Sequence, residues 1–241
     1  MRKILFSFLF VFFTTNIISD DHGIKPGSLV AEFHYFDVTD PISFVGAVDK
    51  FDVSSCADNW REQSGVNVAL YAIGGGSHSH LILVTYDDYD KMLLGRSIFG
   101  SCADSAQMID SLDGFSNSPK YYNYVSELVL ESGDWTTDTV FANVDIKVES
   151  GEEADYLNAW KTFMESQESV GSFGINRIMF GNKYQTHMIF LGSTSMTELT
   201  DSMKTAFSSR AYQTYLNKVE DIRTNVQTRM AQFVKAYPNE R

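Results

Sequence analysis

The sequence contains one strand–turn–strand pattern twice, and this repeat constrains the fold more than any other feature. The first copy spans residues 66–86 and the second spans residues 173–192, and a shift of 107 positions superimposes them so that Gly74 falls on Gly181. Glycines mark the chain reversal in both copies, because glycine adopts the positive φ angles of a tight turn without a steric penalty. The repeat therefore predicts a chain made of two equivalent halves.

The first 19 residues have the pattern of a secretory signal peptide. Arg2 and Lys3 precede an apolar run over residues 4–13, and small and polar residues follow it. The run is shorter than the roughly 20 apolar residues of a membrane-spanning helix. We therefore expect removal of residues 1–19, a tail over residues 20–28, and a periplasmic or secreted protein with no stable membrane insertion; the alternative is an uncleaved anchor.

The chain is acidic, and this argues against nucleic acid as a partner. Its formal charge is −12, and loss of the signal peptide with Arg2 and Lys3 takes the charge to −14. Nucleic-acid binding depends on clustered Lys and Arg side chains, whereas the 19 basic residues are scattered. The acidity is explained by solubility outside the cytoplasm.

Two cysteines, Cys56 and Cys102, lie in the first half. In an exported protein such a pair indicates a disulfide. A redox-active dithiol would need the C-x-x-C spacing, which this pair lacks. Two free thiols are the remaining alternative.

Strand and helix patterns follow one another in the same order in both halves. Asp40 followed by Pro41 is typical of a helix start, and Ser195 with Glu198 forms a capping-box pattern. The end of the chain fits either a last strand with a short helix or one long helix, and we favour the strand. The expected strands lie at 29–38, 66–73, 79–86, 125–130, 139–148, 173–180, 186–192 and 219–227, and the expected helices at 40–59, 89–98, 152–170 and 196–207.

One stretch of the first half, residues 99–114, has no predicted counterpart in the second half. Beyond it the halves align at a smaller shift of 91, which lays Tyr121 and Tyr124 on Tyr212 and Tyr215. We therefore expect a 16-residue insertion, tethered by the disulfide, which makes the two halves unequal.

Each half has the order β-α-β-β-α-β, which is the ferredoxin-like split pattern. The first unit is expected over residues 29–134 and the second over residues 135–241. Such a unit covers one face of its sheet with helices, yet the strands here are apolar on both faces. Face-to-face pairing of the two antiparallel sheets would bury the second face. The predicted class is therefore α+β, with two units forming one α/β barrel.

In element order, duplication and hairpin pattern, the chain resembles the dimeric α/β-barrel superfamily, which includes the antibiotic-biosynthesis monooxygenase-like and stress-responsive barrel families. The resemblance covers nearly all of the chain after the signal peptide. It implies a monomer that forms an internal pseudo-dimer, where relatives commonly pair two chains. Some relatives bind haem through a histidine that is typically on a helix; since the histidines here fall in strands, turns or the tail, we expect no cofactor, haem included.

His80 and His187 occupy the same position in the two copies of the hairpin. They are candidate catalytic groups if they face the enclosed volume, because a histidine suits general-base chemistry at neutral pH. The alternative is that duplication preserved a structural histidine. His34 would lie on the order of 13 Å from His80 along paired strands, so no shared metal site is expected.

The barrel interior is the predicted binding site. We expect it to bind a small apolar or aromatic molecule, although the same side chains would also serve as a packed core. The alternatives are a cofactor-independent monooxygenase-like enzyme that uses His80 or His187, and a partner-binding module that uses residues 99–114. No hydrolase, zinc-protease or nucleotide motif occurs. The candidate ligand-binding residues are His34, Phe36, Tyr71, Arg177, Met179 and Phe180.

Overall fold

The computed structural model describes residues 23–167 and 171–238 and has the predicted α+β class. Each half of the chain forms a four-stranded antiparallel sheet, as the hairpin repeat predicts. The first sheet contains β2 (Val30–Phe36), β3 (Asn67–Gly74), β4 (His80–Tyr86) and β5 (Tyr122–Ser132), and the second contains β6 (Val140–Val148), β7 (Phe173–Phe180), β8 (His187–Ser193) and β9 (Arg223–Tyr237).

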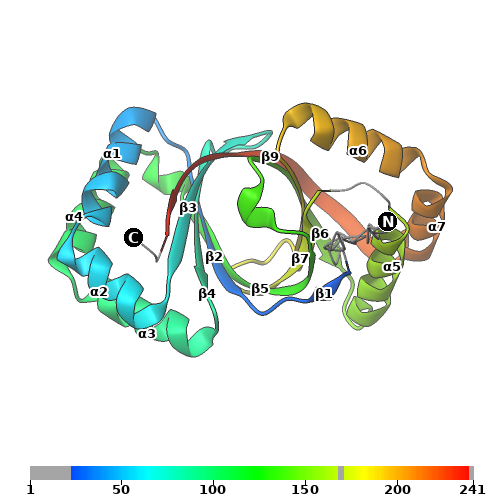
Figure 1. The fold of residues 1–241 in the computed structure, drawn as a ribbon, viewed down its shortest axis with the longest axis horizontal. Helices are drawn as coiled ribbons and strands as arrows, with labels where there is room; N and C mark the ends of the chain where they lie inside the picture. Colours follow the sequence, from blue (N-terminus) through cyan, green and yellow to red (C-terminus); the bar gives the residue numbers. More distant parts are fainter. Residues whose placement is uncertain (1–22, 168–170, 239–241) are drawn as a thin grey trace, which may run out of the picture.

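The eight strands form one closed barrel (Figure 1). Each sheet has the ferredoxin-like order, β5-β2-β4-β3 and β9-β6-β8-β7. The sheets join at their edges, where β3 pairs with β9 and β5 pairs with β7, and a short strand β1 (Lys25–Pro26) adds to β5. The expected face-to-face pairing is thus accompanied by edge pairing, and closure leaves no unpaired backbone groups along the barrel edges.

Helices cover the outer face of each sheet, at opposite ends of the molecule (Figure 1). The predicted helix starts are confirmed: Asp40 accepts a hydrogen bond from the backbone N–H of Ser43, and Ser195 accepts one from that of Glu198, both at 3.2 Å. The first unit carries α1 (Pro41–Asp52), α2 (Ser55–Ser64), α3 (Tyr89–Gly100) and α4 (Ala103–Gly114), and the second carries α5 (Glu153–Glu165), α6 (Met196–Ser208) and α7 (Arg210–Val219).

The expected insertion over residues 99–114 has a counterpart after all. This stretch contains the whole of α4, and α7 follows α6 as α4 follows α3. The shift of 107 positions, which lays Ala103 on Arg210, therefore continues through this region, and the tyrosine match at a shift of 91 was misleading. The last strand accordingly begins at Arg223, not at Val219, and the alternative of one long terminal helix is wrong.

Alternating side chains of each strand divide the apolar residues among three cores, because successive residues of a strand point to opposite faces. On β2, for example, Phe33 and Tyr35 point into the barrel, whereas Val30 and Phe36 point outward beneath the helices. Each helix layer therefore has its own core, and the third core fills the barrel interior.

The predicted disulfide is present, with an S–S distance of 2.06 Å between Cys56 and Cys102. It joins α2 to the residue that precedes α4. The predicted signal peptide lies outside the described residues. Among residues 23–167 and 171–238, no helix is long and apolar enough to cross a membrane.

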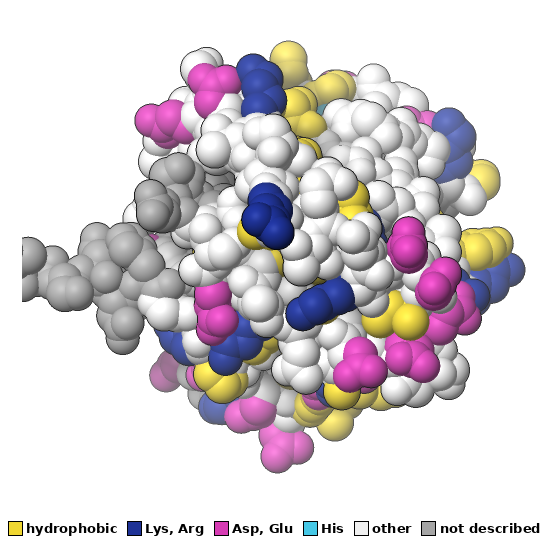
Figure 2. Space-filling view, turned by 90° about the vertical axis from the view of Figure 1, so that its right-hand side faces the viewer, with side chains coloured by type: hydrophobic (Ala, Val, Ile, Leu, Met, Phe, Trp, Pro, Cys, Tyr) yellow, Lys and Arg dark blue, Asp and Glu magenta, His cyan; other side chains and the backbone are white. Residues whose placement is uncertain are grey.

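The end of the molecule that carries α5, α6 and α7 has a mixed surface. Figure 2 shows acidic and basic side chains dispersed among neutral ones on this face, with Lys and Arg in separate positions. The described residues of this face show no continuous basic patch in this view, and such a patch is what nucleic-acid binding depends on.

Candidate functional site

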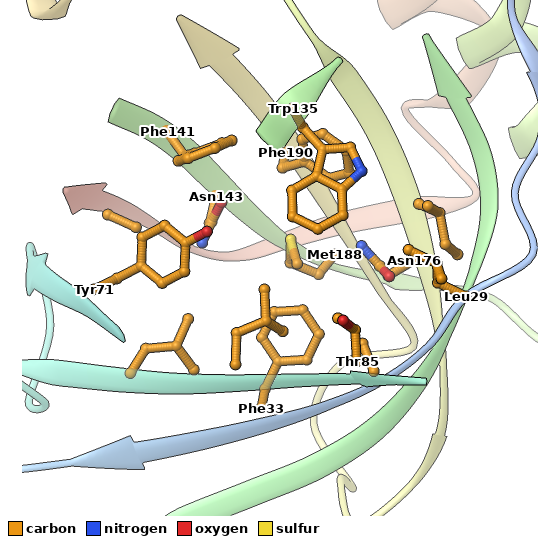
Figure 3. A pocket seen from close by; sticks show the side chains of 15 residues that line it. Leu29, Phe33, Tyr71, Thr85, Trp135, Phe141, Asn143, Asn176, Met188 and Phe190 are labelled. Atoms are coloured by element: carbon orange, nitrogen blue, oxygen red, sulfur yellow. The ribbon is translucent and has the colours of Figure 1, made fainter. Parts of the chain in front are cut away.

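The barrel encloses a cavity of about 60 Å³. Figure 3 shows side chains from both sheets around it, with Trp135 at one side. Its walls are largely apolar and include Phe33, Met188 and Phe190. Tyr71 lines this cavity as predicted. Sites for drug-sized ligands typically measure about 300–1,000 Å³, so this cavity is too small for an aromatic ligand of ordinary size.

A buried ion pair occupies another part of the barrel interior. Asp145 on β6 pairs with Arg229 on β9, and both side chains are almost fully buried. The guanidinium carbon of Arg229 lies 4.2 Å from the centre of the Tyr35 ring. Burial raises the pKa of Asp145 to about 6, against the opposing effect of Arg229. The pair holds two barrel strands together across the interior and was not predicted from the sequence.

The matched histidines point away from the barrel interior. The ring of His80 lies 5.7 Å from that of Phe44 on α1, and the ring of His187 lies 6.1 Å from that of Tyr156 on α5. Burial is the main cause that lowers the pKa of both imidazoles. Their positions give no support to a general-base role inside the barrel.

A repeated hydrogen-bond motif explains why both copies keep a histidine. The hydroxyl of Ser79 accepts a hydrogen bond of 2.8 Å from a backbone N–H at the end of β2, and it lies 3.0 Å from Nδ1 of His80. Thr186 makes the equivalent contacts at 2.8 Å and 2.9 Å with β6 and His187. In each unit the hydroxyl residue and the histidine beside it therefore fasten the hairpin to the neighbouring strand. This agrees with the alternative that duplication preserved a structural histidine.

Five of the six predicted ligand-binding residues lie outside the barrel cavity. Arg177 points outward and pairs with Glu153 on α5, and Met179 and Phe180 are 39% and 59% exposed at the end of β7. His34 and Phe36 also point outward, but they border a second and larger pocket.

This larger pocket, of about 490 Å³, lies between the outer face of the first sheet and helices α1 to α4. We call it the first-unit pocket. Its walls are mostly apolar, with charged and polar side chains among them. The apolar walls include Phe51, Trp60, Ile82, Phe99 and Leu112; Asp52, Arg61 and Asp113 also line the pocket, and a separate polar group comprises Glu32, His34, Arg96 and Tyr121.

The polar group forms one chain of contacts. Arg96 Nε donates to Glu32 Oε1 at 2.5 Å, Glu32 Oε2 lies 3.3 Å from His34 Nε2, and His34 Nδ1 lies 2.6 Å from the hydroxyl of Tyr121. Burial alone would raise the pKa of Glu32, but the hydrogen bonds and charges of His34 and Arg96 lower it below its ordinary value. Glu32 is therefore a buried carboxylate at neutral pH, whereas the Arg96 side chain is half exposed.

The second unit has apolar residues at the corresponding positions. The two units can be compared because the same register pairs the first strand of each unit with its matched histidine, and the shift of 107 relates α3 to α6. In place of Glu32, His34 and Arg96 the second unit has Ala142, Val144 and Met203. These three belong to the apolar core of the second unit, where the rings of Phe163 and Tyr215 stack 5.3 Å apart. The polar chain is thus a feature of one unit and not a requirement of the fold.

Sequence reasoning found His34 but missed Glu32, Arg96 and Tyr121. One signal was present: Glu32 is the only charged residue in the otherwise apolar run of β2. A lone carboxylate in a buried strand needs a partner, and its presence marks the site. Among residues 23–167 and 171–238, no group of three or more His, Cys, Asp or Glu side chains is arranged to hold a metal ion.

No known protein family's sequence profile and no curated protein sequence matches this chain. Solved structures do match over nearly its full length. They include an anthrone oxidase-like protein (TM-score 0.62, 8% identity, covering 90% of this chain and 97% of that one), a proposed monooxygenase from Fusobacterium nucleatum (0.59, 12%, 88% and 95%) and a haem-binding protein from Thermus thermophilus (0.52, 11%, 88% and 93%).

These similarities confirm the fold of the dimeric α/β-barrel superfamily. They also overturn the expectation that no cofactor is bound and that haem is disfavoured, because a haem-binding protein is among the structures that share the fold. Haem was disfavoured because its histidine ligand was expected on a helix. His34 shows why that requirement is too narrow: a strand places its imidazole on the wall of a pocket beneath the helices.

The first-unit pocket fits haem only if one contact of His34 is exchanged. An imidazole is a common axial ligand, and His34 borders the pocket. Both of its ring nitrogens have partners, since Nδ1 lies 2.6 Å from the Tyr121 hydroxyl and Nε2 lies 3.3 Å from Glu32 Oε2, so an iron ligand at Nε2 would displace Glu32. Arg96 is half exposed on the same side. By contrast, aromatic rings cover His80 and His187.

Proposed function

We propose that this protein binds a small, largely apolar and aromatic molecule, and that the site is the first-unit pocket and not the barrel interior. The size of the pocket, about 490 Å³, lies within the range of drug-sized sites. The observation that carries the proposal is the polar chain Arg96–Glu32–His34, which the second unit replaces with apolar core. A buried charged chain without a structural requirement is typical of a binding site.

The apolar walls would hold the body of the ligand, and the polar chain would set its orientation. The Tyr121 hydroxyl and Arg96 are both partly exposed beside the pocket and would donate hydrogen bonds to a ligand oxygen. Glu32 would keep the His34 ring in place through its 3.3 Å contact. Haem is one ligand of the proposed class: with haem, His34 Nε2 would hold the iron in place of its contact with Glu32, Arg96 would hold a propionate, and the bound group would supply a redox-active iron centre.

We also infer that the protein is exported and monomeric. The Cys56–Cys102 disulfide supports export, because disulfides persist mainly in oxidising compartments. Closure of the barrel within one chain supports the monomer. Mass spectrometry of the protein purified from its native host would test both inferences: a chain that begins near residue 20 and has the mass of one copy under native conditions agrees with them, whereas an intact N-terminus or a dimer does not.

Isothermal titration against aromatic compounds, lipid-like compounds and haem would test the binding proposal. We expect saturable one-to-one binding by the wild type and at least a tenfold loss in an Arg96→Met variant. The matched control is Lys204→Met, which removes a cation from an exposed pair on α6 and leaves binding unchanged.

A second pair of variants would test the position of the site. Met108→Trp fills the first-unit pocket, whereas Met203→Trp adds the same bulk at the packed helix layer of the second unit. Equal binding by both variants, or no binding of any compound by the wild type, would refute the proposal.

A further inference from the structure

The barrel cavity has polar groups that the proposed function does not use. Thr85, Asn143 and Asn176 line this otherwise apolar space and are only 7%, 5% and 5% exposed. Figure 3 shows the three side chains around the cavity, on strands of both sheets. Burying a polar group without a hydrogen-bond partner is unfavourable, so each of them requires an explanation.

Much of their hydrogen-bonding capacity is unused. Within the described part of the chain, the side-chain amide of Asn143 makes no hydrogen bond. Asn176 accepts a bond of 3.4 Å from the Ser126 hydroxyl through Oδ1, which leaves its NH₂ group available. The cavity thus presents both donors and acceptors to whatever occupies it.

The fold does not require these amides. At the matching positions of the first unit, Phe33 replaces Asn143 and Tyr71 replaces Asn176. Both replacements belong to the interior core of the barrel. The two amides are therefore specific to one half of the barrel.

One short segment lies at the open end of the barrel. The 3₁₀ turn Trp135–Thr137 lies in the connection between the two units and crosses this end in Figure 1. Asp134 holds this turn through bonds of 3.0 Å from the Thr136 N–H and 2.9 Å from the Thr137 hydroxyl. The Trp135 side chain lines the cavity and is only partly buried, so a small molecule that enters from this end would meet it first.

We propose that the barrel interior is a second binding site, which takes a small uncharged molecule of the short-chain amide or alcohol class. Its hydrogen-bonding group would meet Asn143 and Asn176, and its alkyl part would pack on Phe33 and Met188. The size follows from the volume: a cavity of about 150 Å³ accommodates benzene, whereas this one measures about 60 Å³. A charged ligand is disfavoured because the cavity lining, among the residues that the structure describes, includes no charged side chain to offset its desolvation.

Methionine-methyl NMR of the full chain, titrated with ethanol, would test the proposal. Met188 lines the barrel cavity and Met108 lines the first-unit pocket, so one sample reports both sites. We expect a saturable shift at Met188 and none at Met108. Xenon, an apolar probe of similar size, should also shift Met188.

Two substitutions separate hydrogen bonding from cavity size. In Asn143→Ala, the affinity for ethanol should fall about tenfold, because the ligand hydroxyl loses its partner, while xenon binding persists in the enlarged cavity. Asn158→Ala, an exposed change on α5, should alter neither. If the alanine variant fails to fold, Asn143→Val provides the same comparison, because valine also lacks a hydrogen-bonding group.

Three outcomes would overturn the proposal. The first is an absence of saturable response at Met188 to ethanol. The second is an equal affinity of wild type and Asn143→Ala for ethanol. The third is a crystal structure, grown with ethanol, in which the cavity contains ordered water only.

Discussion

The polar chain of the first-unit pocket leads to a quantitative prediction about stability. Replacing Arg96 with Met, the residue type that the second unit has at this position, leaves the Glu32 carboxylate buried with only its 3.3 Å contact to His34. Removing one partner of a fully buried ion pair costs about 3–5 kcal/mol. Because half of the Arg96 side chain is exposed to solvent, we discount this to about 1–3 kcal/mol.

The triple variant Glu32→Ala, His34→Val, Arg96→Met should recover most of that loss. It reproduces the apolar set of the second unit, and replacing a buried ion pair by apolar side chains is often neutral or stabilising. Urea unfolding followed by circular dichroism gives the free energy of unfolding of each variant. The exposed pair provides the control, since Lys204→Met should change stability by less than about 0.5 kcal/mol.

The effect of Arg96→Met should also depend on pH. The pKa of Glu32 is lowered in the folded protein, so its contribution to stability is present above the pKa of the unfolded chain and is lost as pH falls through the lower folded value. The difference between wild type and Arg96→Met should therefore shrink on acidification. Equal stability of these two proteins at neutral pH, or a triple variant less stable than the single one, would refute the reasoning.

Three further changes should have the following effects. Replacing Cys56 and Cys102 with Ser should lower the free energy of unfolding by about 4 kcal/mol in the chain-entropy model, because the bridge closes a long loop; thermal denaturation with and without reductant measures it. The pKa of Asp145 is raised to about 6, so its contribution to stability should be lost as pH rises through that value, and Asp145→Asn should remove this part of the pH–stability curve. Gly95→Ala would place a Cβ 2.6 Å from the Tyr86 ring, and overpacking of this kind costs about 1–3 kcal/mol by urea unfolding.

The sequence predicted the architecture well because the hairpin repeat and the helix caps are local signals. It misjudged which side chains face the barrel interior. On β4 and β8 both faces are apolar, so the hydrophobic pattern has no contrast that identifies the inner face, and the sequence left open whether His80 and His187 face the interior. The α7 helix was missed for a different reason. The pair Tyr212 and Tyr215 matched the pair Tyr121 and Tyr124 by chance, which shifted the alignment of the two halves.

The site was harder to predict than the fold because its residues meet only through tertiary contacts. Arg96 on α3 is 64 positions from Glu32 on β2, and Tyr121 is 87 positions from His34. No spacing rule connects residues so far apart. The one local signal, a single carboxylate in an apolar strand, becomes informative once the second unit is seen to carry Ala142 at that position.

The central claim is that the ligand is held beneath the helices of the first unit. Methionine-methyl NMR of the full chain, titrated with the tightest compound from the aromatic and lipid-like panel, tests this claim most directly. We predict that Met108 shifts on binding while Met188 in the barrel and Met203 in the second unit do not. A shift confined to Met188 or to Met203 would contradict the claim, because it would place the ligand in the barrel or in the opposite unit.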